Sequence, residues 1–281
     1  HLQPVKWIND WPVMGEQIND DAGQPVMKHR KPDIGEQAVA AAKNFRHKNN
    51  LTDIYAPDAS DDFTGDRLGL QWQWNANHLN HWYSMTGHGI ELYPVDKPES
   101  TSIANVPNLL LQKWIAPEFS AVTELACDTV EEGCVAGMVS LGVDYGAAAV
   151  RRRKGNLSII SVSGSQTFKN EKAYSEDKVV ELTNIDSTVE KVFFRNRVES
   201  LPMIEKNVTR NKIYLDYSLD GTNYENVLAY EATAGRWVGV KNGIFCCHEI
   251  KQDEFNAAGS CEGKKRNGAL FNCFRITELS K

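Results

Sequence analysis

The sequence predicts an all-β protein, built as a two-sheet antiparallel β-sandwich over residues 61–281. Short runs rich in Val, Ile, Leu and aromatic residues recur at fairly even spacing, separated by Gly, Pro, Asn and Asp. Helical periodicity is missing after residue 90. Hydrophobic residues make up 41% of the 281 residues, which is enough for a sizeable core. Many short strands within about 220 residues are typical of a β-sandwich.

The segment 61–83 is expected to supply the first strand of this sandwich. Large apolar residues alternate there with polar residues or glycine, as in a strand with one buried face: Leu68, Leu70, Trp72 and Trp74. The Asn- and His-rich segment 75–80 then predicts a turn. Further along, Asp220-Gly221 predicts a hairpin with a type I′ turn. The basic run 151–154 precedes Gly155 and Asn156, which favours a turn between strands over a phosphate site.

The first 60 residues are predicted to be two connecting pieces outside the sandwich. Residues 1–30 contain short extended segments around the polar turn 19–23, and they resemble the edge of a sheet that lies elsewhere. The acidic and amide groups of this turn suit a solvated hairpin tip better than a calcium loop, because the ligand spacing of a known loop is absent. Residues 31–60 are expected to form a linker, with a short Ala-rich helix within 35–49.

Composition narrows the possible partners. Lys and Arg total 31 against 37 Asp and Glu, a mildly acidic balance that argues against a nucleic-acid partner. No apolar run approaches the roughly 20 residues needed to cross a bilayer, so no membrane partner is expected. We expect a secreted or periplasmic protein, whose signal segment has been removed or precedes His1.

The six cysteines leave several disulfide pairings open. Neither the cysteines nor the histidines are spaced like metal ligands, and no cofactor is expected. Cys127 and Cys134 flank an expected hairpin end and either pair across two strands or remain free. Cys246 and Cys247 should point to opposite sheet faces, so at most one of them joins Cys261 or Cys273. Cys247-His248 is no nucleophile pair, because neighbours in a strand point apart. Three histidines are expected to be solvated loop residues rather than zinc ligands: His78, His81 and His88.

Five motifs in order resemble the C-terminal concanavalin A-like sandwich of glycoside hydrolase family 43 β-xylosidases, over roughly residues 60–279. They are Asp62-Phe63 with Leu68–Asn75, Asn108–Gln112, Tyr217–Gly221, Gly235–Lys241 with Gly243–Cys246, and Phe271–Arg275. The same sandwich is classed as carbohydrate-binding module family 91, associated with xylan. Where relatives often carry Arg-Thr-Phe-Gly-Pro, with an aromatic residue leaning toward the active site, this sequence has Lys113–Pro117, with Trp114 as its second residue.

The start of the chain resembles the last blade segment of that family's five-bladed catalytic propeller, through residues 1–7 and 11–15. The resemblance implies an inverting hydrolysis in which Asp and Glu residues of the propeller act as base and acid. Their carboxyl groups would lie about 6.5–9.5 Å apart, leaving room for a water molecule. None of these positions maps onto this sequence, so no catalytic residue is assigned.

The function expected from the resemblance is an accessory sugar-binding and packing sandwich of a xylan-degrading β-xylosidase. Its partners would be xylan or xylo-oligosaccharides and the catalytic propeller of the same protein. Sugar binding needs aromatic faces against pyranose C–H groups and polar side chains for the hydroxyls. The candidates are Trp74, Asn75, Asn77, Trp82 and Trp114, although the tryptophans in strand patterns also fit a structural core.

Two alternatives remain. The sandwich could itself be a hydrolase, as in other concanavalin A-like enzymes that place two Glu on one strand facing a concave sheet. Glu131 and Glu132 are adjacent and so face opposite ways, and no Glu-X-Asp-X-X-Glu-like strand is present. Alternatively, the sandwich binds no sugar and serves only as a packing partner of the propeller.

Overall fold

The computed structural model describes residues 3–19, 22–26, 35, 59–95, 102–169, 172–202, 210–233, 239–248 and 268–277. The chain divides into two compact units, His1–Ala56 and Pro57–Lys281. Most of the expected linker, including its helix within 35–49, lies outside the described residues, as does Cys261.

The first unit contains two small antiparallel hairpins. Strands β1 (Val5–Ile8) and β2 (Trp11–Met14) pair through a turn at Asn9 and Asp10, whose φ angles are 49° and 63°. Positive φ at both central residues is the type I′ geometry, which suits the twist of a hairpin. Strands β3 (Glu16–Asn19) and β4 (Ala22–Gln24) pair as a second antiparallel hairpin, and residues 20 and 21 of the expected polar turn lie outside the described residues.

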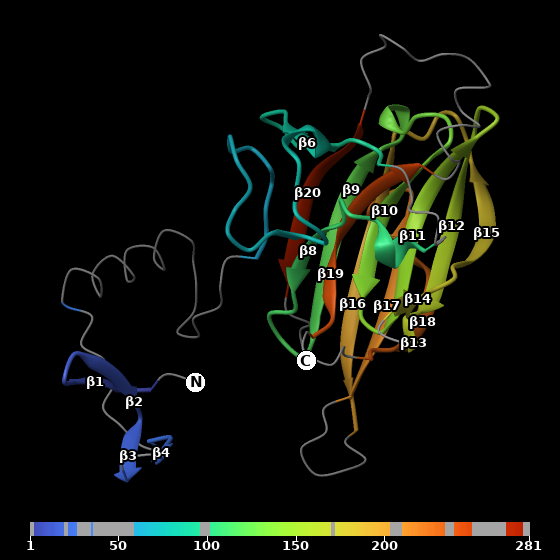
Figure 1. The fold of residues 1–281 in the computed structure, drawn as a ribbon. Helices are drawn as coiled ribbons and strands as arrows, with labels where there is room; N and C mark the ends of the chain where they lie inside the picture. Colours follow the sequence, from blue (N-terminus) through green and yellow to red (C-terminus); the bar gives the residue numbers. More distant parts are fainter. Residues whose placement is uncertain are drawn as a thin grey trace. The chain divides into compact units, whose positions relative to one another are not determined.

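The second unit is a sandwich of two seven-stranded antiparallel sheets, as predicted (Figure 1). One sheet, here called the β10 sheet, has the order β15 (Lys178–Ile185), β12 (Asn156–Ser165), β11 (Asp144–Arg153), β10 (Cys134–Leu141), β19 (Lys241–His248), β8 (Leu110–Lys113) and β5 (Gln73–Trp74). The other, the β9 sheet, has the order β18 (Glu225–Glu231), β17 (Arg210–Ser218), β16 (Lys191–Leu201), β9 (Phe119–Ala126), β20 (Ala269–Thr277), β7 (Ile90–Leu92) and β6 (Tyr83–Met85). A separate hairpin joins β13 (Thr167–Lys169) to β14 (Lys172–Tyr174).

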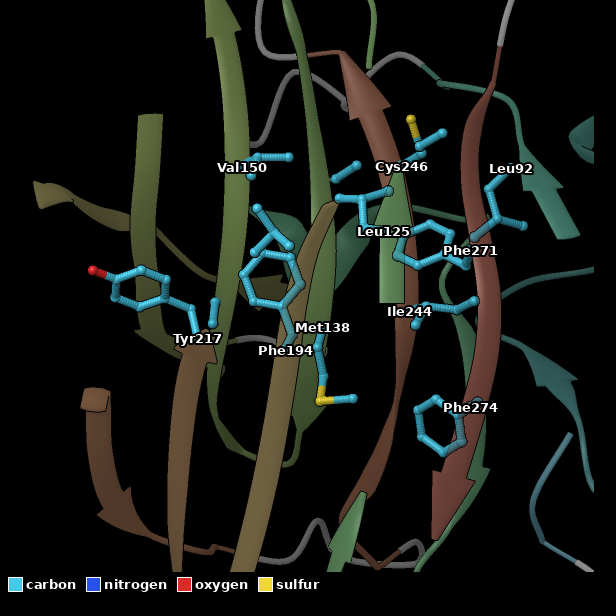
Figure 2. Packing of buried hydrophobic residues seen from close by; sticks show 14 of the residues in the cluster. Leu92, Leu125, Met138, Val150, Phe194, Tyr217, Ile244, Cys246, Phe271 and Phe274 are labelled. Carbon is cyan, nitrogen blue, oxygen red and sulfur yellow. The ribbon is translucent and has the colours of Figure 1, made fainter. Parts of the chain in front are cut away.

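The main core lies between the two sheets. Alternate residues of β16 are buried there, as a period of two requires: Val192, Phe194, Asn196 and Val198. Figure 2 shows Phe194, Met138, Ile244 and Phe271 between strands of the two layers. The sequence pattern therefore specifies which face of each strand is buried.

A second, smaller core covers the outer face of the β10 sheet. Outward residues such as Val139, Ala147 and Phe245 are fully buried there. They lie with Ile103 and Ala104 of the 3₁₀ turn η2 (Ile103–Asn105), which belongs to the crossing segment 102–109, here called the strap. All eight residues of β10 are consequently buried, since both faces of this strand are covered.

A polar contact fixes the strap to the sheet. The Tyr145 hydroxyl lies 2.8 Å from Ser102 Oγ and 2.9 Å from Asp177 Oδ1. Asp177 Oδ2 accepts a hydrogen bond from the Ile103 backbone N–H at 2.8 Å. Burial is the main cause that raises the pKa of Tyr145, to about 12. Each buried polar group of this contact is thus paired, which holds the strap in place.

The first strand is much shorter than the sequence predicts. Within 68–74 only Gln73–Trp74 forms a strand, and Leu70 is fully exposed. The Trp72 backbone N–H instead bonds the Gly69 carbonyl at 3.2 Å, closing a turn. Leu68, Trp72 and Trp74 still pack against the main core. The prediction of a strand was therefore wrong for most of this segment, because tertiary contacts of Trp72 outweigh the alternation.

Two turn predictions had different outcomes. Lys154 and Gly155 have φ of 52° and 79° and join β11 to β12, so the basic run is a hairpin end, as expected. A hairpin also joins β17 to β18, but Asp220 lacks a positive φ and Gly221 alone has one, at 76°. The Asp220 carboxylate instead accepts the backbone N–H of Thr222 and of Asn223, which forms a longer polar loop. The type I′ prediction at this site was wrong.

The cysteines are free thiols in the described part of the chain: Cys127, Cys134, Cys246, Cys247 and Cys273. Cys127 follows β9 in one sheet and Cys134 begins β10 in the other, so the segment between them crosses the sandwich and is no hairpin end. No disulfide joins this pair. Cys246 and Cys247 do face opposite ways, since they belong to the main and the outer core respectively.

Candidate functional site

The five predicted sugar-binding residues do not form one site. Trp74 pairs with Leu110 of β8, whereas Trp114 follows the other end of β8. Four residues of extended chain span about 13 Å, so the two indoles mark opposite ends of this strand. The remaining candidates, Asn75, Asn77 and Trp82, have different surroundings and different roles.

Trp74 lies in an aromatic cluster at the sheet edge. Its ring centroid is 6.1 Å from that of His78 in a nearly parallel arrangement, 5.7 Å from Trp82 and 5.4 Å from Tyr83. Trp74 is half-buried, and the exposed His78 ring stacks beside it. Trp82 is 4% exposed, so it is a core residue and offers no face to a ligand.

The two asparagines play different roles. The Asn75 side-chain amide donates to the carbonyls of Ala104 at 2.9 Å and Val106 at 3.0 Å. Its donors thus hold the strap and are not available for a sugar. Asn77 is exposed.

Trp114 packs edge-on against Phe119, with ring centroids 5.7 Å apart. Its indole Nε1 is buried and has no hydrogen-bond partner among the described residues. The side chain as a whole is half-buried. Trp114 is therefore anchored in the sandwich by its ring.

A groove that the sequence interpretation missed lies beside β20. Its volume is about 500 Å³, and it is lined by Ser60, Asp61, Asp62, Gly65, Arg67, Gly69, Gln71 and Arg275. This size lies within the range of small-molecule sites. The signal in the sequence was the polar, glycine-interrupted segment 60–71, which the alternation of Leu68–Trp74 concealed.

Asp61 lines this groove and is held in place by four hydrogen bonds. Its backbone pairs with Phe274 of β20 in both directions, at 2.8 and 2.7 Å. Its Oδ1 accepts the Phe63 N–H and its Oδ2 accepts Trp72 Nε1–H, both at 2.8 Å. Phe63 is fully buried and has a φ of 53°, a left-handed conformation that is costly for a bulky residue. The hydrogen bonds and the buried ring hold the segment in this shape.

The groove combines both signs of charge. The Thr64 hydroxyl and backbone N–H bond Asp62 Oδ1 and hold the pKa of this carboxyl below its ordinary value. A hydrogen bond to the Cys273 sulfur, with the charge of nearby carboxylates, raises the pKa of Arg275. Arg67 is exposed and forms no ion pair with the described residues. The guanidinium groups and the Gln71 amide offer hydrogen-bond donors to a polar ligand.

The outer face of the β10 sheet carries no catalytic pair of carboxylates in the described structure. The strap and the apolar second core fill this face. Glu131 and Glu132 precede β10 in a loop, and the Glu132 carboxylate accepts the backbone N–H of Lys154 and Gly155. Glu132 therefore stabilises a turn, and the pair is not arranged as acid and base.

The described residues offer neither a metal-binding cluster nor an accessible thiol. No group of three His, Cys, Asp or Glu in the described ranges could hold a metal ion, and His78, His81 and His88 are exposed. Cys134 Sγ lies 3.7 Å from His248 Nδ1 across β10 and β19. A hydrogen bond from the Cys246 thiol, with His248, lowers the pKa of Cys134 to about 6 against the effect of burial. Cys134 is only 1% exposed, so a substrate has no access to its thiolate.

No helix in the described part of the chain is long and apolar enough to span a bilayer.

The two-sheet architecture and the strap-covered sheet define a concanavalin A-like β-sandwich domain. Residues 60–258, more than half of the chain, match the family model described as the beta-xylosidase C-terminal concanavalin A-like domain. The chain therefore belongs to this family of glycoside hydrolase domains. Apart from Arg275, the residues that line the groove lie at the start of the matched region.

Relatives of known name agree with this family. A beta-xylosidase of Formosa agariphila is 23% identical over 275 residues, which are 90% of this chain and 40% of the relative. A putative beta-xylosidase of Xylanibacter ruminicola is 23% identical over 249 residues, covering 86% of this chain and 38% of the relative. The chain thus spans about two-fifths of the length of these curated relatives.

Solved structures share the fold. A bifunctional GH43-CE protein of Bacteroides eggerthii aligns with a TM-score of 0.60 at 24% identity, covering 100% of this chain and 31% of that one. A xylan beta-1,4-xylosidase from Bacillus halodurans aligns with a TM-score of 0.56 at 16% identity, covering 98% of this chain and 46% of that one.

Proposed function

We propose that this chain is the accessory domain of a xylan-degrading β-xylosidase, and that it binds xylan or xylo-oligosaccharides in the groove beside β20. The family match and the names of the relatives support the enzyme class. The groove is the observation that carries the binding role. Catalysis is assigned to the propeller of the same protein, which packs against the sandwich. Such an enzyme is expected to be secreted or periplasmic.

The polar groups of the groove suit the hydroxyl groups of a pyranose chain. Arg67, Gln71 and Arg275 supply donors, and Asp62 keeps its Oδ2 for a ligand because Thr64 bonds only Oδ1. Hydroxyl groups donate and accept, so a groove with both kinds of partner fits a neutral sugar better than an ion. Trp74 and His78, on the neighbouring edge, provide an aromatic surface for an extended chain.

Two observations weigh against the alternatives. A hydrolase within this sandwich would need two available carboxylates on an open sheet face. The second core fills the outer face of the β10 sheet, and in the β9 sheet Glu124 is ion-paired with Lys191 and Asp216 with Arg195. A purely structural domain has no need of an open groove lined by charged and amide side chains. The first alternative predicts turnover by this chain alone, and the second predicts no affinity for xylan.

Affinity electrophoresis in gels containing xylan tests the proposal. The wild-type chain should migrate more slowly with xylan than without it, and the double variant Arg67→Gln/Arg275→Gln should lose at least half of this retardation. Arg153, an exposed arginine at the end of β11, provides the control: Arg153→Gln should be retarded by xylan as much as the wild type. Equal migration of the wild type with and without xylan would support the purely structural role.

An assay of xylose release from xylo-oligosaccharides addresses the hydrolase alternative. The purified chain should release no xylose above the buffer blank. Turnover that disappears on mutation of one carboxylate of this chain would reject the accessory role. Trp82→Ala is unsuitable as a binding probe, because removing this buried ring would disturb the core.

A further inference from the structure

A layer of buried polar side chains crosses the interior of the sandwich. On the β10 sheet, Asn242 of β19 lies directly opposite Ser140 of β10 on one side and Gln112 of β8 on the other. Directly opposed residues have Cβ atoms about 5 Å apart and share one face of the sheet. Met138, Ile244 and Leu110 lie two residues away in the same strands and belong to the main core. The three polar side chains therefore point between the sheets, where each is at most 1% exposed.

Asn196 of β16 faces this row from the opposite sheet. It is fully buried and lies between Phe194 and Val198, which both belong to the main core. Its neighbour in β17 is Leu215, whose Cδ1 lies 3.3 Å from the position that a Cβ on Gly146 would take.

Gly146 is in turn the cross-strand partner of Ser140. The strands β10 and β16 pack on each other across the core, as do β11 and β17. Leu215 and Gly146 therefore face each other across the core. Asn196 lies beside Leu215 in its sheet and Ser140 lies beside Gly146 in the other, so Asn196 lies across the core from Ser140. The other neighbour of Asn196 is Ala121, a small residue of β9 that also belongs to the main core.

Six side-chain atoms of this layer have no protein partner in the described part of the chain. Both side-chain atoms of Asn196 and of Asn242, Ser140 Oγ and Gln112 Oε1 form no hydrogen bond with the described residues. Buried polar groups in folded proteins are almost always paired with protein or with ordered water. Six such atoms converging on one layer therefore indicate a ligand between the sheets.

The donor set identifies the ligand. A metal ion needs oxygen ligands and favours carboxylates, but this layer contains no carboxylate and includes two amide NH₂ groups, which repel a cation. Water donates and accepts, so it satisfies amide carbonyl, amide NH₂ and hydroxyl together. We propose that the layer formed by Gln112, Ser140, Asn196 and Asn242 is a binding site for a cluster of ordered water molecules that bridges the two sheets.

This water cluster also helps to position Ala59, the residue that precedes the groove segment. Gln112 Nε2 donates to the Ala59 carbonyl at 2.9 Å, and Ala59 lies at the start of the second unit. Water bound to Gln112 Oε1 fixes the orientation of this amide. The water bound in the core thus helps to hold Ala59, near the start of the second unit.

A crystal structure of the full chain at a resolution better than about 1.8 Å tests the proposal directly, since ordered waters are visible there. We expect density for water within hydrogen-bonding distance of Asn196, Asn242 and Gln112 Oε1. A direct Asn196–Asn242 hydrogen bond without density between the sheets would overturn the proposal. Density with short contacts to five or more oxygens would identify a cation and would also overturn it.

Magnetic relaxation dispersion of ¹⁷O water provides a second readout in solution. The variant Asn196→Leu should lose at least one long-lived water relative to the wild type, whereas the exposed control Asn77→Leu should lose none. If Asn196→Leu does not fold, Ser140→Ala serves the same purpose with a smaller change. An unchanged number of long-lived waters in a folded variant of the layer would contradict the proposal.

Discussion

Asp61 Oδ2 accepts a hydrogen bond from Trp72 Nε1–H at 2.8 Å. The same carboxylate caps the Phe63 N–H, and the Trp72 ring lies 5.6 Å from that of Phe63 and 5.1 Å from that of Phe274. One carboxylate and one indole thus join the segment 60–72 to β20, and the carboxylate of Asp61 lines the groove. The stability of the groove depends on this pair.

The variant Trp72→Phe tests this dependence. It keeps an aromatic ring but leaves Asp61 Oδ2 without its donor, which should lower the free energy of unfolding by about 1–3 kcal/mol. Urea unfolding monitored by circular dichroism measures the loss. Trp114→Phe is the matched control, because the Trp114 Nε1–H has no partner to lose within the described structure. If both variants lose the same stability, the hydrogen bond to Asp61 contributes nothing.

Removing the carboxylate of Asp216 should destabilise the β9 sheet. Asp216 is 2% exposed and accepts hydrogen bonds from Arg195 Nε at 2.9 Å and Asn226 Nδ2 at 2.8 Å. Asp216→Ala leaves the guanidinium without its partner, and a loss of about 3 kcal/mol is expected by analogy with other broken buried pairs. Thermal and urea unfolding measure it. The exposed control Asp186→Ala should cost less than half as much.

The protein should become less stable in acid, because the pKa values of three carboxyl groups are lowered in the folded state. Backbone and side-chain hydrogen bonds from Asn223 hold the pKa of Asp220 well below its ordinary value, and those from Thr64 and Thr188 lower the pKa of Asp62 and Asp186. A folded-state pKa below the unfolded value favours folding above the unfolded pKa, near 4, and this contribution disappears as the pH falls through the folded value.

Urea unfolding between pH 7 and pH 2 measures this dependence. These groups should change the urea midpoint little between pH 7 and about pH 5, and the midpoint should decrease at lower pH. Asp220→Asn should have a shallower acid dependence than the wild type. A midpoint that rises below pH 4 would be inconsistent with the hydrogen-bonded loops.

The buried cysteines predict a specific pattern of thiol reactivity. Cys127, Cys134, Cys246, Cys247 and Cys273 are free and at most 9% exposed. We expect them to react slowly with Ellman's reagent in the native protein, and at least five thiols to react in guanidinium chloride without a reductant. Fewer than five reactive thiols in the unfolded chain would show that at least one of these five cysteines is in a disulfide.

The sequence predicted the architecture because alternation in the long strands records which face is buried. The opposite orientation of Cys246 and Cys247 and the turn at Lys154-Gly155 follow from strand periodicity and local turn chemistry, and both are confirmed. These features depend on residues close together in the sequence.

The groove and the short first strand could not be predicted in the same way. Leu70 fits the alternation of a strand, yet it is fully exposed. Asp61 and Trp72 fix a turn there, and both also contact Phe274, more than 200 residues away. The crossing between β9 and β10 likewise depends on which sheet each strand joins. The five predicted sugar-binding residues were chosen by residue type, and burial separates Trp82 from Trp74.

The central claim, that the groove of a non-catalytic sandwich binds xylo-oligosaccharides, is tested most directly by an NMR titration with xylohexaose. In ¹H–¹⁵N spectra of the full chain, the account predicts concentration-dependent shifts for the backbone amides of Gly65 and Gly69 and for the Trp72 indole, with the Trp82 indole unchanged. The account would be contradicted if no signal from residues 60–71 or Arg275 moved at saturating xylohexaose.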